Sequence, residues 1–325
     1  PDELPELASF AAARKSNDDT ESDVYDRAQR PLTAILHQAR WHSLLKDLSA
    51  DTREASRFIS ASQPFAGAAF NMVPSQYDFR IPTEEYQVML QRRLGLPLTV
   101  MRGIEHSAAL GRAVDPLGDT FLTYHNHSRR HNGVAAVLGR AATQALCRKV
   151  LVATIQHEQF SPGARPDVAI LKGGRDRQHH LLLEVKVLCP LSSVEGGSDV
   201  DGAYAAFGAT RGIKRTILGC GAVGGREAIV AKYIGAQKLH HAVVPMIFET
   251  FGGMEGAAVS TLNDWAARAR GKTPPGEEPP WCARNYVPYW SQILSKEAQR
   301  GAAEEIISRV REETTACEAV RTRSG

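Results

Sequence analysis

The chain has 325 residues, a formal net charge of +3, 43% hydrophobic residues and 23% charged residues. This composition is typical of a globular protein long enough to bury a sizeable core, in one domain with extensions or in two. No stretch reaches the apolar length of a membrane helix, and the polar start Pro1–Pro5 does not resemble a signal peptide, so no membrane partner is expected. Five cysteines, never paired as CxxC, predict free thiols in a reducing compartment such as the nucleus or an organelle matrix: Cys147, Cys189, Cys220, Cys282 and Cys317.

The first two segments of the chain are expected to precede the main core. Residues 1–28 are acidic and polar and predict an extended arm. Residues 29–127 are predicted to be a helical lead-in region, and Thr83-Glu84-Glu85 within it is typical of a helix start. The apolar residues at helical spacing in this region are Leu32, Ile35, Leu36, Leu44, Leu45 and Leu48.

Residues 128–260 are predicted to form the main α/β core. Asn132 can cap the first helix of this core, and Pro245 in its last strand indicates a sheet edge. In chain order the expected elements are a helix over 133–147, strands over 150–156, 167–172 and 181–188, a helix over 203–217 and a strand over 242–248.

The remaining segment, residues 261–325, is expected to be an extension of that core. Its prolines and glycine at 272–280 predict a linker. A last helical segment is predicted over 289–314, so the extension should be helical.

Two acidic side chains and a lysine are predicted to gather on neighbouring strands. Glu184 and Lys186 lie two apart in an apolar run, so both project from the same face of a buried strand. The turn Gly173–Asp176 lets the preceding strand lie beside it, which brings Asp167 near Glu184. Like charges at this range repel unless a cation neutralises them, and carboxylate oxygens suit Mg²⁺. The spacing therefore predicts a Mg²⁺ or Mn²⁺ site on Asp167 and Glu184.

The pair Pro166-Asp167 followed by Glu184-Val185-Lys186 resembles the signature of the PD-(D/E)xK, or restriction-like, nuclease superfamily. The resemblance implies that Asp167 and Glu184 hold the metal, that the Val185 carbonyl can add a ligand, and that Lys186 orients the attacking water. It also implies a restriction-endonuclease-like core, a mixed central sheet flanked by helices. A metal-bound water is a good nucleophile near neutral pH, which suits these roles. A surface hairpin with a solvated glutamate and lysine is the alternative interpretation of so short a motif.

Further upstream, the chain resembles the region that leads into the endonuclease domain of non-LTR retrotransposon proteins. The similar stretches are Pro64–Phe70, Arg93–Pro97, Asp115–Asp119 and Arg130-His131-Asn132. In that family a zinc knuckle precedes the Arg-His-Asn signature, but here its four ligand positions carry Ser107, Leu110, Thr120 and Tyr124. None of these is a thiolate or imidazole ligand, so zinc is not expected. Histidines left in the segment form either a polar surface or an unusual all-imidazole site: His106, His125, His127 and His131.

Accessory residues are expected around the proposed metal site. Glu158 lies between the first strand and the Pro-Asp pair, where it either joins the metal or is solvated. His131 opens the core helix and either caps it or joins the site. The residues predicted to contact nucleic acid, chiefly its phosphates, are Arg129, Arg130, His131, Lys232 and Lys238. Ordinary solvated helix faces would give similar basic clusters.

The sequence therefore predicts a metal-dependent endonuclease that hydrolyses nucleic-acid phosphodiester bonds, with DNA favoured over RNA. One alternative is a retrotransposon-derived protein that kept the fold and became a nucleic-acid-binding or scaffolding subunit of a large ribonucleoprotein, such as an organellar ribosome, with other protein subunits as partners. Another is a dinucleotide site, because Gly219–Gly224 is a GxGxxG string and Glu249 ends a later apolar strand. The stretch before those glycines is short for a strand, which favours a simple Gly-rich loop.

Overall fold

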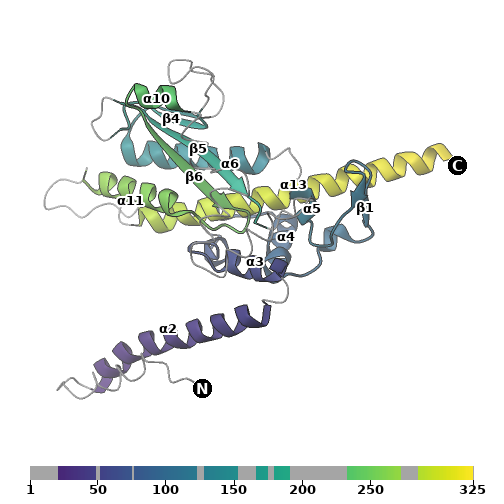
Figure 1. Ribbon diagram of the computed structural model, residues 1–325, viewed down its shortest axis with the longest axis horizontal. Helices are drawn as coiled ribbons and strands as arrows, with labels where there is room; N and C mark the ends of the chain where they lie inside the picture. Colours follow the sequence, from purple (N-terminus) through teal and green to yellow (C-terminus); the bar gives the residue numbers. More distant parts are fainter. Residues whose placement is uncertain are drawn as a thin grey trace. The chain divides into compact units, whose positions relative to one another are not determined.

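In the computed structural model, the apolar run that predicts a buried strand forms β5 (Leu181–Leu188), an interior strand of the described four-stranded sheet. Figure 1 shows it between β4 (Val168–Ile170) and β6 (Ala242–Glu249). The described sheet has the order β3-β4-β5-β6, where β3 spans Val150–Val152. Pairs β3-β4 and β4-β5 are antiparallel, whereas β5 and β6 run parallel. The prediction of an α/β chain with a mixed sheet flanked by helices is therefore confirmed at this level.

Alternate residues of β5 point to opposite faces of the sheet. Different helices pack on these two faces. Leu181, Leu183, Val185 and Val187 belong to the large apolar core with α6 (Ser128–Leu146), α11 (Gly256–Arg270) and α13 (Tyr286–Ser324). Leu182 packs on the other face with Tyr233 and Ala236, at the short helix α10 (Ile234–Lys238). Strand β6 is an edge of the described sheet, as Pro245 predicts.

Helices α6 and α13 pack against each other in the large apolar core. Helix α6 begins at Ser128 rather than 133, so Asn132 lies inside it and cannot be its N-cap. The two helices pack closely at Gly301, where a Cβ would come within 2.5 Å of the Arg130 Cα. Glycine is needed at this crossing because any side chain would push the helices apart. Helix α13 is longer at both ends than the predicted 289–314, and α11 lacks a counterpart among the predicted elements.

The lead-in region is helical, as predicted. Helix α3 spans Thr52–Ala61, and α4 (Thr83–Leu94) begins at the predicted residue. Gly95 ends α4 in the left-handed region, with φ of 67°, and its N–H donates to the Arg92 carbonyl. The shorter elements are η1 (Ala68–Asn71), η2 (Tyr77–Phe79), η3 (Thr99–Met101), β1 (His106–Ser107), β2 (Arg112–Ala113) and α5 (Asp119–Leu122).

Contacts divide the chain into two units, Pro1–Ala50 and Asp51–Gly325. Helix α2 (Glu21–Leu48) is the described part of the first unit, and its start lies in the segment predicted to be an extended arm. The structure describes residues 21–48, 52–74, 77–122, 128–152, 166–174, 179–190, 233–271 and 285–324. The predicted helix over 203–217, the linker over 272–280 and Gly219–Gly224 lie outside these residues.

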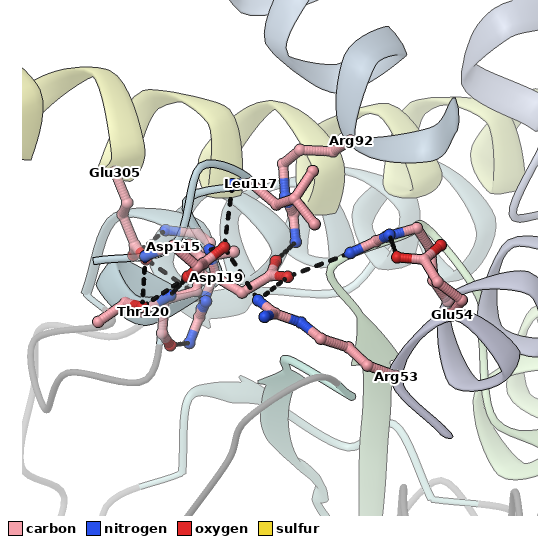
Figure 2. Close-up of polar contacts among 11 residues, drawn as sticks. Arg53, Glu54, Arg92, Asp115, Leu117, Asp119, Thr120 and Glu305 are labelled. Atoms are coloured by element: carbon pink, nitrogen blue, oxygen red, sulfur yellow. Dashed lines mark hydrogen bonds and ion pairs between the residues drawn. The ribbon is translucent and has the colours of Figure 1, made fainter. Parts of the chain in front are cut away.

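A network of ion pairs around the buried Asp119 joins α3, α4 and α5. Figure 2 shows Asp119 facing Arg53 and Arg92, with Nη2–Oδ distances of 2.8 and 3.1 Å; Arg57 also lies 3.4 Å from Asp119. Nearby, Asp115 accepts hydrogen bonds from the Thr120 N–H and hydroxyl at 2.7 and 2.5 Å. Burial alone would raise the pKa of Asp115, but these hydrogen bonds and the Arg53 charge outweigh it and lower the pKa.

Glu249, the last residue of β6, is a buried carboxyl group that accepts hydrogen bonds from uncharged side chains. Its Oε2 accepts hydrogen bonds from the Ser60 hydroxyl and from Gln63 Nε2, the latter at 2.9 Å. Its Oε1 has no hydrogen-bond partner within the described residues. Burial raises the pKa of Glu249 to about 7 despite the two donors. Because the side chain is enclosed against α3, it is not presented to a dinucleotide ribose, so that alternative loses its acidic residue.

Glu249 should make the protein less stable as pH rises. Its pKa is raised from 4.5 to about 7 in the folded state, so between these values the unfolded chain releases a proton that the folded chain keeps. Stability attributable to this group should fall by about 3 kcal/mol over that interval and then level off. In urea unfolding, the stability of Glu249→Gln relative to wild type should increase from pH 4.5 to pH 7.5. A difference that stays constant with pH would contradict this prediction.

Candidate metal and nucleic-acid site

The structure brings together Asp167, Glu184 and Lys186 at the point where β4 begins, beside the middle of β5. The backbone N–H of Asp167 donates to the Leu183 carbonyl at 3.1 Å. In return, the Asp167 carboxylate accepts the Val185 N–H, with an N–Oδ2 distance of 2.6 Å. Glu184 and Lys186 follow Leu182 on the face of β5 that packs against Tyr233. The local prediction of a shared face is therefore confirmed.

Each carboxylate is paired with a basic side chain of the protein itself. Lys186 Nζ lies 2.9 Å from Glu184 Oε1, and His131 Nε2 lies 3.2 Å from Asp167 Oδ2. The hydrogen bond to Asp167 is the main cause of the raised pKa of His131, which favours its charged form. Burial opposes ionisation of Asp167, yet the His131 hydrogen bond and charge lower the pKa of Asp167. A metal ion is therefore not required to balance these two carboxylates.

His131 occupies a different place from the one that a helix cap would take. It lies within the first turn of α6, after Ser128, and its ring faces Asp167. Of the two predicted roles, the structure therefore favours membership of the site. The first turn of a helix also lies at the positive end of the helix dipole, which favours a nearby anion.

Tyr233 is the residue of this site that the sequence analysis did not identify. Its hydroxyl donates to Glu184 Oε2 at 2.6 Å, and its side chain is fully buried. Burial, followed by the hydrogen bond to Glu184 and the nearby negative charges, raises the pKa of Tyr233, so the hydroxyl stays protonated. Tyr233 is 49 residues from Glu184 and outside the strand pattern, so no periodic signal links them.

The donor set fits a magnesium ion that shares its coordination with a substrate. Within the described ranges, no group of three or more His, Cys, Asp and Glu side chains is arranged to hold a metal. Mg²⁺ in proteins often takes only one or two carboxylates, and completes its shell with water and phosphate oxygens. Asp167 and Glu184 can supply that pair. The ligand role of the Val185 carbonyl stays a prediction, and Glu158 lies outside the described residues.

The predicted phosphate contacts differ in their exposure. Arg129 is 53% exposed and pairs loosely with Glu304, with a closest N–O distance of 3.8 Å. Arg130, by contrast, is 2% exposed, lies 3.5 Å from Glu305 and donates to the Leu122 carbonyl at 3.1 Å. Contrary to the prediction, Arg130 therefore stabilises the contact between α6 and α13 rather than facing a ligand. Lys238 is exposed at the end of α10, and Lys232 lies outside the described residues.

At the expected zinc-knuckle positions, the segment is held by a carboxylate from α13. The Ser107 hydroxyl and the backbone N–H of Ala108 and Ala109 all donate to Glu313. Leu110 N–H in turn donates to the Ser107 hydroxyl at 3.1 Å. Thr120 binds Asp115 instead, and Tyr124, His125 and His127 lie outside the described residues. Hydrogen bonds thus organise the hairpin β1-β2, while the absence of zinc stays a prediction.

A second cluster of imidazoles lies where β5 and β6 begin. The His180 and His241 ring centroids are 4.6 Å apart, and the His179 and His240 rings lie beside them. The Nδ1 atoms of His180 and His241 accept backbone N–H groups of Lys172 and His180, so in the neutral rings Nε2 carries the proton. A metal can bind Nε2 only when that nitrogen carries no proton, which requires the opposite tautomer. The arrangement therefore favours hydrogen bonding over metal binding.

Comparisons of the chain with protein-family models, curated proteins and solved structures each found no match. No helix in the described part of the chain is long and apolar enough to cross a membrane.

Glu313→Gln should destabilise the hairpin β1-β2. Burial alone would raise the pKa of Glu313, but the hydrogen bonds from Ser107, Ala108 and Ala109 outweigh it and lower the pKa. The stabilisation should therefore be present above the ordinary pKa and be lost as pH falls through the folded value. Losing a charged acceptor should cost about 1–3 kcal/mol at neutral pH, measured by urea unfolding. The matched control is Glu312→Gln, an exposed neighbour paired with Arg309. Equal losses in the two variants would contradict the assigned role.

Proposed function

We propose that this chain is a restriction-like, metal-dependent endonuclease that hydrolyses nucleic-acid phosphodiester bonds, with DNA favoured over RNA. The observation that carries the proposal is the grouping of Asp167, Glu184 and Lys186 on one face of a mixed sheet, beside the start of β4. The element order supports it as well, because helix α6 and three antiparallel strands precede the parallel strand β6. This is the order expected for a restriction-like core.

Each residue of the group has a chemical role in this proposal. Asp167 and Glu184 would hold Mg²⁺ or Mn²⁺, which supplies an activated water and stabilises charge on phosphate oxygens when bound. Lys186 is 44% exposed on its side chain, so its ammonium group can donate both to Glu184 and to a water or phosphate oxygen outside the protein. Arg129, in the first turn of α6, adds a positive charge that attracts the substrate.

The second candidate is a binding or scaffolding subunit of a large ribonucleoprotein. The observation that favours it is the neutralisation of Asp167 by His131 and of Glu184 by Lys186. A site balanced in this way is stable without metal, so the fold can persist after catalysis is lost. In that case the exposed basic residues would bind phosphates and no bond would be cleaved.

Replacing Lys186 should separate the two candidates. An endonuclease should lose cleavage by about 100-fold or more in Lys186→Ala, because a donor to the reacting groups is removed. Binding to the same nucleic acid should change little, since other basic residues contribute to affinity, and it should weaken steeply with salt. Lys172→Ala, an exposed lysine beside His180, is the control and should cleave normally. Wild type that binds DNA or RNA but cleaves neither with Mg²⁺ or Mn²⁺ would support the scaffold instead.

Metal uptake provides an independent measurement. Titration calorimetry with Mn²⁺ and no nucleic acid should detect binding to wild type and its loss in Asp167→Asn, which keeps the side-chain shape but removes the charge. Asp78→Asn is the control, because Asp78 pairs with Arg140 on the surface. Equal uptake by wild type and Asp167→Asn would locate the ion elsewhere.

A further inference from the structure

A buried hydroxyl contacts the candidate site from the helix α10 side. Tyr233 comes directly before α10, and its ring packs with Ala169, Leu182 and Ala236 on the sheet face that also carries Glu184. Its hydroxyl donates to Glu184 Oε2 at 2.6 Å. The main apolar core lies on the other face of the sheet, so Tyr233 joins α10 directly to the strand that bears the carboxylate.

The two oxygens of Glu184 therefore have unlike surroundings. Oε2 faces the buried Tyr233 hydroxyl, whereas Oε1 faces Lys186, whose side chain is 44% exposed. The Tyr233 hydroxyl is a neutral donor held in the apolar packing of Ala169, Leu182 and Ala236. A neutral donor on Oε2 fixes the carboxylate plane without cancelling its charge. Oε1 is then the oxygen at which a divalent cation would take the place of Lys186.

We infer that Tyr233 is a positioning residue of this site, holding Glu184 Oε2 so that Oε1 is presented to a divalent cation and to the hydrolytic water. The inference rests on the proposed endonuclease function. Loss of a group that orients a ligand side chain reduces metal affinity or activity by about 10- to 100-fold in known metal sites. The competing explanation is that the hydrogen bond only fastens α10 to the sheet.

The chain contains a matched control for that competing explanation. Tyr286 is equally buried, and its hydroxyl donates to the Ala141 carbonyl at 2.7 Å in the core between α6 and α13. Burial raises its pKa as well. Tyr233→Phe and Tyr286→Phe therefore each remove one buried hydroxyl and keep the ring, but only the first removes a contact to Glu184.

The experiment compares both variants with wild type in three measurements. Calorimetry with Mn²⁺, without nucleic acid, should show about 10-fold or greater weakening in Tyr233→Phe and none in Tyr286→Phe. Cleavage assays should show kcat lowered by about 10- to 100-fold in Tyr233→Phe, with KM for the nucleic acid unchanged. Thermal unfolding should show that both variants fold.

The outcomes separate the inference from the function on which it rests. Active wild type with equal metal affinity and kcat in the two variants would overturn the positioning role and leave the endonuclease intact. Wild type that neither binds Mn²⁺ nor cleaves DNA or RNA would overturn both. If Tyr233→Phe fails to fold, Glu184→Gln, which keeps the contact atoms in place, should reproduce the loss of Mn²⁺ binding; unchanged binding there would also refute the inference.

Discussion

Burying a carboxylate is costly unless hydrogen-bond donors surround it, and this constraint organises the unit from Asp51 onward. Asp119 is surrounded by arginines from α3 and α4, and these contacts fix α5 against both helices. Glu313 of α13 accepts a hydrogen bond from Ser107, 206 residues earlier, in the hairpin β1-β2. Glu249 of β6 accepts hydrogen bonds from Ser60 of α3 and from the nearby Gln63. Glu184 of β5 accepts one from Tyr233, directly before α10. Each of these segments is thereby held by a hydrogen bond or ion pair with a residue far away in the sequence.

Local patterns predicted several of the elements, though not α11, and did not predict these contacts. The continuous apolar run of β5 and the spacing of Glu184 and Lys186 predict a buried strand with both charges on one face, because a strand alternates every residue. Thr83 and Gly95 are local signals too, and the structure has a helix between them. Tyr233 and Glu313 could not be found in this way, since their partners are fixed only when distant segments pack. For the same reason Arg130, which looked like a surface cation, is buried against α13.

The charges of the candidate site show where reasoning from sequence alone was incomplete. Two neighbouring carboxylates do need positive charge nearby, but the sequence pattern does not tell whether a metal ion or a basic side chain supplies it. The structure has His131 at Asp167 and Lys186 at Glu184, so the protein satisfies the requirement by itself. These two pairings stabilise the fold. They favour neither the endonuclease nor the scaffold. What separates them is whether a divalent ion binds these carboxylates and cleavage follows.

The same pairing sets a condition on catalysis. A divalent ion at Asp167 and Glu184 would have to compete with His131 and Lys186 for the same oxygens, so binding metal would release two cationic groups. Lys186 is partly exposed and has a flexible stem, so it can turn toward a phosphate when released. His131 lies beside the positive end of α6, where an arriving phosphate would also be favoured. Arg130 cannot take part in this exchange, because Glu305 and the core hold it. In an enzyme built on this site, the protein's own cations would thus pass from carboxylate to phosphate once metal and substrate are both bound.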